Sequence, residues 1–237
     1  MKLVVFSDIH GNRYAFDAFI NELERIKYDY LIFCGDIFGY YYDQQYIFEK
    51  LQKMKKLIWL KGNHDDYFLK AYCDCAKERE LIKNYGHSYH NIRGKYSDTI
   101  YRTLKELSGK AELYMDKQKI GIFHGTPEDS LMGRLYPNNQ IVNKELYSRY
   151  DIVILGHTHF RMARYLKNLD TLIVNPGSLG QPRDGKGSCF LVLDIINKKL
   201  EFYTVKYDNK ELYKQIELYD KELSKLKDVL ERKELDY

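Results

Sequence analysis

Aspartate, asparagine and histidine gather in five short segments of this chain. They are Asp8-Ile9-His10, Gly35-Asp36, Gly62-Asn63-His64-Asp65, His124-Gly125 and Gly156-His157-Thr158-His159. Each segment follows a short apolar run that is typical of a buried β-strand. Carboxylate and imidazole groups at neighbouring strand ends are common ligands of divalent metal ions in proteins. The five segments therefore predict a metal site.

The number of candidate ligands indicates what kind of site this is. Two aspartates and four histidines stand at the predicted strand ends, namely Asp8, His10, Asp36, His124, His157 and His159. Two of these pairs are spaced i and i+2, which on an extended backbone points both side chains the same way. Six ligands are too many for one tetrahedral zinc ion and suit two ions of higher coordination number. The two oxygens of Asp36 could bridge such a pair.

The apolar runs before these segments alternate with helical patterns. Residues 3–6, 31–34 and 57–60 read as strands, whereas residues 12–27 and 43–54 have helical spacing. This alternation predicts βαβ units with a parallel sheet, whose ligand sites lie beyond the carboxyl ends of the strands. Further strand-like runs, several joined by short turns, predict antiparallel pairs at 111–115, 119–123, 152–155, 160–166, 171–174, 189–195 and 200–206. The fold class is α/β.

Two stretches depart from this pattern. Residues 66–110 are polar and rich in tyrosine, and they predict a helical insertion near the site with helices at 66–83 and 98–108. Residues 208–237 predict one C-terminal helix after a domain of residues 1–207. Its heptad seam consists of Leu212, Ile216, Tyr219, Leu223, Leu226 and Leu230. This seam either docks on the body of the same chain or forms a homodimer contact, and the sequence leaves both open.

Composition limits the classes of function. The chain has 237 residues, of which 44% are hydrophobic and 30% charged, so it can bury a core. Its net charge of +4 is compatible with an anionic substrate. It is not the concentrated basic footprint of a nucleic-acid binder, so we expect no stable nucleic-acid complex. The four cysteines lack the spacing of a disulfide framework, and no signal peptide or membrane span is recognisable. We expect a cytoplasmic protein with no membrane partner.

The order and placement of the five segments resemble those of the calcineurin-like metallophosphoesterase superfamily. The runs 8–12 and 175–183 further resemble its small bacterial and archaeal phosphoesterases. The resemblance implies a four-layer α/β/β/α sandwich of two mixed sheets, with a dinuclear metal site at the strand ends. It assigns the first ion to Asp8, His10, Asp36 and His159. It assigns the second to Asp36, Asn63, His124 and His157. Manganese is the expected metal, and iron, zinc, nickel and cobalt also suit these ligands.

A dinuclear site of this family implies the hydrolysis of a small or medium phosphate ester, either a monoester or a diester. A hydroxide that bridges the two metals would attack phosphorus in line. His64 would donate a proton to the leaving oxygen, and Asp65 would orient the His64 ring. Asn12 and Arg183 are candidates for substrate binding, since an arginine can grip a non-reacting phosphate. Nucleotide-derived esters belong to this substrate class.

Two other functions remain as alternatives. One is a non-catalytic metal-binding scaffold of the same fold, and the other is a nuclease. The presence of His64 beside a full ligand set argues against the scaffold. Nucleases of this family carry large domains that grip DNA, whereas this chain has only the insertion at 66–110 and a short tail. The loop 39–43 departs from the Gly-Tyr-Gly-Pro of many relatives, so the sequence does not indicate the shape of the substrate.

Overall fold

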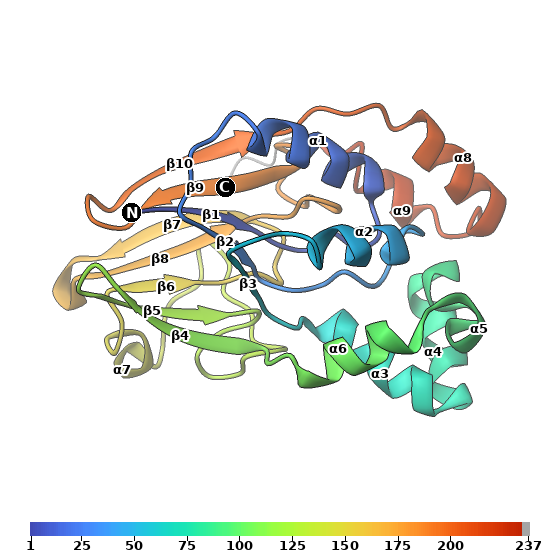
Figure 1. The fold of residues 1–237 in the computed structure, drawn as a ribbon, viewed down its shortest axis with the longest axis horizontal. Helices are drawn as coiled ribbons and strands as arrows, with labels where there is room; N and C mark the ends of the chain where they lie inside the picture. The colour runs from blue at the N-terminus through green and yellow to red at the C-terminus, as the bar shows by residue number, and fades with distance from the viewer. Residues whose placement is uncertain (234–237) are drawn as a thin grey trace.

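Two mixed sheets of five strands form the centre of the computed structural model, which describes residues 1–233 (Figure 1). The first sheet has the order β10-β9-β1-β2-β3. Its strands are β1 (Lys2–Phe6), β2 (Tyr30–Phe33), β3 (Leu57–Trp59), β9 (Cys189–Asp194) and β10 (Lys199–Thr204). The second sheet has the order β4-β5-β6-β8-β7. Its strands are β4 (Lys110–Met115), β5 (Gln118–Phe123), β6 (Ile152–Ile154), β7 (Arg161–Leu166) and β8 (Thr171–Pro176).

Parallel pairing brings the ends of the ligand-bearing strands together. Strands β1, β2 and β3 run parallel, as do β5, β6 and β8. The remaining pairs, β1 with β9, β9 with β10, β4 with β5 and β7 with β8, are antiparallel. Each parallel strand exits at the same edge of its sheet as its parallel neighbours. The predicted α/β class with two mixed sheets is therefore confirmed.

The side chains of β1 show how the layers are stacked. Leu3 and Val5 belong to the apolar core between the two sheets, whereas Val4 and Phe6 pack on the helical side. This alternation follows from the two-residue period of a strand. Helices α1 (Arg13–Leu23) and α2 (Gln44–Leu51) cover the outer face of the first sheet (Figure 1). The outer face of the second sheet is covered by loops and the single-turn helix α7 (Lys144–Tyr147), so the fourth layer of the sandwich is thin.

The segment between β3 and β4 is helical, but in more pieces than the sequence predicts. It contains α3 (Asn63–Cys73), α4 (Cys75–Tyr85), the 3-10 turn η1 (His87–Tyr89), α5 (Ile92–Lys95) and α6 (Asp98–Glu106). The predicted first helix is divided at Asp74, whose side chain accepts a hydrogen bond from Ala76 N at 2.7 Å and so caps α4. A second 3-10 turn, η2 (Lys167–Leu169), connects β7 and β8.

The prediction of one C-terminal helix is wrong over the described residues. The tail forms α8 (Lys210–Tyr219) and the short α9 (Lys225–Asp228), and residues 234–237 lie outside the described part of the chain. Helix α8 ends at Asp220, whose carboxylate accepts hydrogen bonds from Tyr42 Oη and His87 N, each at 2.9 Å. The prediction that the seam docks on the same chain is confirmed, because Leu212, Ile216 and Leu226 are buried against the tyrosine run 40–42. A homodimer contact remains a prediction.

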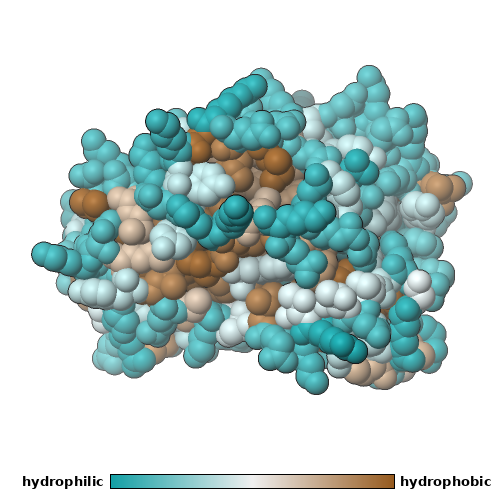
Figure 2. Space-filling view, viewed as in Figure 1, coloured by the Kyte–Doolittle hydropathy of each residue, from teal (hydrophilic) through white to brown (hydrophobic). Residues whose placement is uncertain are grey.

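Polar side chains cover much of the molecular face seen in Figure 1, and hydrophobic ones gather in its left centre (Figure 2). Among residues 1–233, none of the helices combines the length and apolar character that a membrane span requires. The four cysteines are unpaired, with Cys34 and Cys189 buried.

Candidate metal centre

The structure brings the seven predicted metal ligands into one buried cluster. Asp8 and His10 follow β1, Asp36 follows β2, and Asn63 begins α3 directly after β3. From the second sheet, His124 follows β5, and the pair His157 and His159 lies between β6 and β7. All seven side chains are buried. Potential ligand atoms lie within 4.8 Å of one another in three groups, namely Asp8 with His10 and His159, Asp36 with His124 and His157, and His10 with Asp36 and His64.

The ligands converge because the backbone turns sharply after each strand. We expected an extended backbone at the i, i+2 pairs, and this is wrong. Asp8 and His10 have φ of 56° and 50°, and His157 and His159 both have φ of 63°. The left-handed region costs a non-glycine residue about 1 kcal/mol or more, so the surroundings must impose it. Here Asp8 N donates to Gly35 O at 3.0 Å, and Gly180 N donates to Asp8 O at 2.9 Å.

Each aspartate of the cluster has one satisfied carboxylate oxygen and one orphaned oxygen. Asp8 Oδ2 accepts a hydrogen bond from His157 N at 3.1 Å, and Asp36 Oδ1 accepts one from His64 N at 2.8 Å. Asp8 Oδ1 and Asp36 Oδ2 are buried and have no hydrogen-bond partner. Burial, with the charges of Asp65 and Asp8, raises the pKa of Asp36 well above its usual range. A cation is the partner that both orphaned oxygens lack.

Three histidines have their outer ring nitrogen held by the backbone. His10 Nδ1 lies 2.6 Å from Phe38 O, and His124 Nδ1 lies 2.7 Å from Cys34 O. His159 Nδ1 lies 2.6 Å from Gln181 O. A carbonyl can only accept, so each Nδ1 carries the proton and each Nε2 presents a lone pair to the cluster. This tautomer is the one that a ligating histidine needs.

These lone pairs face other acceptors instead of donors. Nε2 of His10 lies 3.0 Å from Nε2 of His159, and Nε2 of His124 lies 2.9 Å from Asn63 Oδ1. Burial and the neighbouring His159 hold the pKa of His10 well below its usual range, and burial lowers the pKa of His159, so protonation does not resolve the contact between these two rings at neutral pH. Opposed acceptors are explained if they share a bound cation. The residues therefore fit a metal centre whose donors, Asp, Asn and His, suit manganese, iron or zinc.

Asp36 occupies the middle of the cluster. Its orphaned Oδ2 lies 3.7 Å from His10 Nε2 and 3.5 Å from His124 Nε2. His10 belongs to the ligand group with Asp8, and His124 to the group with His157. One carboxylate oxygen thus faces both groups.

His64 lies beside the cluster, but Asp65 does not orient it as the sequence analysis expects. Both oxygens of Asp65 accept backbone hydrogen bonds of 2.9 to 3.2 Å, from Gly62 N, Asp36 N, Ile37 N and Phe38 N. Tyr89 contacts the ring instead. Its hydroxyl donates to His64 O at 3.1 Å and lies 2.9 Å from His64 Nδ1, from which it can accept. Asp65 holds the ligand loops together, and Tyr89 sets the orientation of His64.

Three tyrosines form a wall around His64, which we call the tyrosine wall. The ring centroids of Tyr40, Tyr67 and Tyr85 lie 5.0, 5.4 and 4.6 Å from that of His64. Two arginines lie nearby, one at the tyrosine wall and one at the ligand cluster. Arg183 donates to Tyr40 Oη at 3.0 Å, and Arg134 Nε donates to His157 Nε2 at 3.1 Å. The sequence carries no signal for Arg134 or Tyr89, because neither stands in a recognisable motif.

Comparison with known proteins shows to which family the chain belongs. The family model described as the calcineurin-like phosphoesterase superfamily domain matches residues 1–198. This chain belongs to the calcineurin-like phosphoesterase superfamily. It is 26% identical over 240 residues to the uncharacterized protein MJ0912 of Methanocaldococcus jannaschii, covering 90% of this chain and 91% of that protein.

Two solved structures share this fold over most of the chain. The hypothetical protein PH1004 of Pyrococcus horikoshii has a TM-score of 0.81 at 18% identity and covers 99% of both chains. A metallophosphoesterase of Sphaerobacter thermophilus has a TM-score of 0.77 at 20% identity, covering 92% of this chain and 93% of that one. At this identity they establish the fold alone.

Asn12 has a structural role in this phosphoesterase fold, not the predicted contact with substrate. Its side chain is completely buried. Oδ1 accepts from Ala15 N at 3.1 Å and caps α1, while Nδ2 donates to Gly180 O and Tyr207 Oη, both at 2.9 Å. Both polar atoms of the Asn12 side chain therefore have hydrogen-bond partners within the protein. Arg183, in contrast, is half-buried beside the cluster, and its role in substrate binding stays a proposal.

The segment 175–183 supports the ligand loops of both sheets. Asn175 Nδ2 donates to Gly156 O at 2.7 Å and to Thr158 Oγ1 at 3.1 Å, which fixes the loop that carries His157 and His159. Ser178 Oγ donates to Asp8 O at 2.7 Å. These contacts explain why the segment 175–183 occurs together with the five ligand segments in the sequence, although it lies far from most of them along the chain.

Proposed function

We propose that this protein hydrolyses small phosphate esters, mono- or diesters, with two divalent cations held by the cluster. Asp8, His10, Asp36 and His159 would hold one ion, and Asp36, Asn63, His124 and His157 the other. Manganese is the metal that we expect to support the highest rate. One observation carries the proposal, namely the two pairs of buried acceptors that face each other at 3.0 and 2.9 Å. When bound, such ions supply an activated water and positive charge against the phosphoryl oxygens.

His64 would serve as the proton donor to the leaving oxygen. Burial, together with the positive charge of neighbouring groups, lowers the pKa of His64 in the substrate-free protein. A bound phosphate anion acts in the opposite direction and favours the imidazolium. Tyr89 accepts a hydrogen bond from Nδ1, so the opposite ring nitrogen is free to face the substrate. Arg183 and Arg134 would bind non-reacting phosphoryl oxygens of the substrate.

The test is a rate screen on the purified protein with bound metal measured in parallel. We expect turnover of bis-p-nitrophenyl phosphate with added Mn²⁺, its loss in EDTA and about two ions bound per chain. Asp36→Ala is expected to lower kcat/KM by at least about 1,000-fold and to lower the metal content, because both ligand groups lose an oxygen. Asp116→Ala, in the β4–β5 turn, is the matched control. Full activity of Asp36→Ala would overturn the two-metal proposal.

The same screen separates the alternative functions. The panel contains a phosphodiester, a phosphomonoester, dinucleoside polyphosphates, cyclic nucleotides and DNA. Bound metal without turnover of any of them would indicate a scaffold. Preferred cleavage of DNA would indicate a nuclease.

A further inference from the structure

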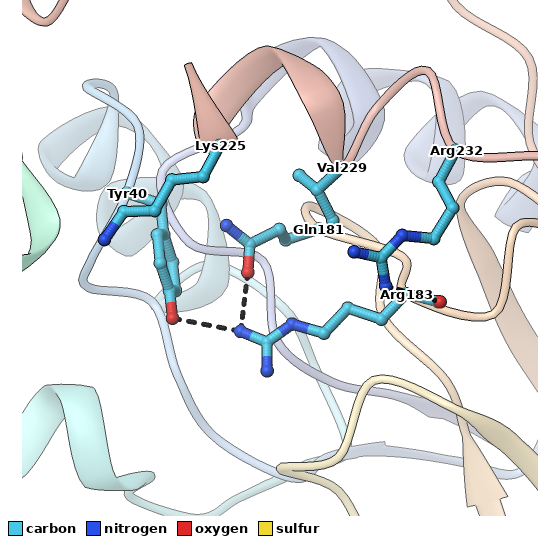
Figure 3. A pocket seen from close by; sticks show the side chains of 6 residues that line it. All are labelled: Tyr40, Gln181, Arg183, Lys225, Val229 and Arg232. Atoms are coloured by element: carbon cyan, nitrogen blue, oxygen red, sulfur yellow. Dashed lines mark hydrogen bonds between the residues drawn. The ribbon is translucent and has the colours of Figure 1, made fainter. Parts of the chain in front are cut away.

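A pocket of about 300 Å³ opens beside the ligand cluster (Figure 3). It is lined by Tyr40, Gln181, Arg183, Lys225, Val229 and Arg232, and we call it the cationic pocket. Figure 3 shows the guanidinium group of Arg183 turned toward Tyr40 and Gln181, with Lys225 and Arg232 descending from the tail above it. Three of the six lining residues therefore carry a positive charge.

These charges have no acidic partner within the described part of the chain. Arg183 Nη2 donates to Tyr40 Oη and Gln181 Oε1, Lys225 Nζ to Asn84 O, and Arg232 Nη1 to Arg183 O. All four acceptors are uncharged, and no carboxylate among residues 1–233 lies within 4.0 Å of these cations. An arginine has five donors and a lysine three, so most of them remain available. The cationic pocket thus offers donors and charge to an anion.

The cationic pocket shares its wall with the metal centre. The ring of Tyr40 packs against His10 and His64, with centroid separations of 4.7 and 5.0 Å. Gln181 O accepts from His159 Nδ1, while its side chain accepts from Arg183. A ligand group in the pocket is therefore separated from the metal ligands by single side chains. One molecule could occupy both places.

The tail builds the outer side of the cationic pocket. Lys225, Val229 and Arg232 lie beyond residue 198, where the family match ends. Their position is fixed by packing, since Leu226 is buried beneath the tyrosine run 40–42 and Tyr41 Oη donates to Leu226 O at 3.0 Å. The cationic pocket is therefore built partly by residues inside the matched domain and partly by the tail outside it.

We propose that the cationic pocket binds a second phosphate group of the substrate. This rests on the proposed function, because the first phosphate is the one cleaved at the metal centre. A volume of about 300 Å³ is at the lower limit for a complete small-molecule site. It suits one substituent of a larger substrate. Two arginines and a lysine match the charge and the fork geometry that phosphate recognition uses. The substrate class is a phosphate ester that carries a further phosphate.

The test compares two chromogenic substrates that differ by one phosphate. They are the 5′-p-nitrophenyl esters of thymidine 5′-phosphate and of thymidine 3′,5′-bisphosphate. We expect wild-type kcat/KM to favour the bisphosphate about tenfold, and Lys225→Gln/Arg232→Gln to remove most of this preference. The control Lys221→Gln/Lys227→Gln removes the same charge from the same segment outside the pocket. A preference that falls equally in both double variants reflects net charge alone and overturns the proposal.

Binding without turnover separates this proposal from the proposed function. Thymidine 3′,5′-bisphosphate and thymidine 5′-phosphate are titrated into the Mn²⁺-loaded protein by calorimetry. We expect about tenfold tighter binding of the bisphosphate in the wild type and in Lys221→Gln/Lys227→Gln, but not in Lys225→Gln/Arg232→Gln. If this holds while neither ester is cleaved, the pocket stands and the hydrolase proposal fails. Equal affinities in the wild type overturn the pocket whatever the turnover.

Discussion

The ligand cluster and the side chains around it are positioned in two different ways. The cluster sits on turns fixed by backbone hydrogen bonds between strand ends, such as Asp8 N to Gly35 O. The tyrosine wall and the cationic pocket combine loop residues such as Tyr40 and Arg183 with side chains from helices of residues 63–106 and from the tail, which pack against the cluster from outside. One region is held by the main chain and the other by side-chain packing.

This difference predicts how each region responds to change. A main-chain turn with left-handed residues has few alternatives, so damage to it should affect all ligands together. Side chains on separate helices can be altered one at a time, with graded effects. Four predictions test this distinction, from the largest expected effect to the smallest.

The largest effect is expected from Gly180→Ala. A Cβ at this position would lie 1.7 Å from Ile9 O, between the ligands Asp8 and His10. Because the obstacle is backbone, we expect a loss of about 3 kcal/mol or more of unfolding free energy and loss of metal binding. Gly94→Ala is the control, since its Cβ would meet only the Asn91 side chain. Chemical denaturation and metal analysis measure both. A stable Gly180→Ala protein with full metal content would contradict a main-chain-controlled cluster.

Acid should destabilise the metal-free protein through the buried histidines. Burial lowers the pKa of His10, His64, His157 and His159 in the folded state, that of His157 to about 3. The unfolded chain therefore binds more protons below its histidine pKa of about 6.5, and stability falls as pH falls. Between pH 7 and 5.5 His157, with its pKa of about 3, should remove about 1 kcal/mol, and the other three rings act in the same direction. Denaturant titrations in EDTA measure this. Asp36→Asn removes the opposing effect of the raised Asp36 pKa, and equal stability at both pH values in that variant would show that these rings are protonated in the fold.

His64→Ala tests whether His64 belongs to the ligand cluster or to the side chains around it. Geometry alone also groups it with His10 and Asp36 as a potential ligand. As a proton donor, its loss should lower kcat about 100- to 1,000-fold and leave the metal content unchanged. Metal analysis of the variant decides the matter, since a loss of one ion per chain would make His64 part of the ligand cluster.

Tyr89→Phe should give the smallest effect. It removes the hydroxyl that orients His64 without emptying the site, so we expect kcat to fall about tenfold while KM stays nearly unchanged. Tyr96→Phe is a matched control, because Tyr96 is also buried and its hydroxyl lies 2.7 Å from Gln44 Oε1 and 3.2 Å from Ser88 O, away from His64. A fall confined to KM, or equal losses in both variants, would remove Tyr89 from the positioning of His64.

The sequence predicts the cluster better than its surroundings for the same physical reason. Parallel strands appear as continuous apolar runs, and a polar residue just after such a run lies at the sheet edge. The sequence therefore predicts the strands and the position of Asp36 and His124 at their ends. The orientation of a helix in an insertion is set by tertiary packing. The sequence therefore does not predict that Tyr89 contacts His64. The break in the tail is similar, because Asp220 is held by Tyr42 and His87 despite an unbroken heptad pattern.

Asn12 and Asp65 show a second limit of sequence patterns. Both stand in motifs with the metal ligands, and both are buried near them. Most of their hydrogen bonds go to the main chain around the ligand loops. Asn12 caps α1, and Asp65 accepts from several backbone amides. A motif marks residues that a site requires without distinguishing those that touch the ligand from those that hold the loops.

Two of the three ligand groups draw side chains from both sheets, since Asp8 joins His159 and Asp36 joins His124 and His157. Any ion held there acts as a cross-link between two sheets that otherwise adhere through an apolar interface. Metal binding would thus couple the unfolding of one sheet to that of the other. In a cell, metal supply would then govern the lifetime of the folded chain against proteolysis as well as its chemistry.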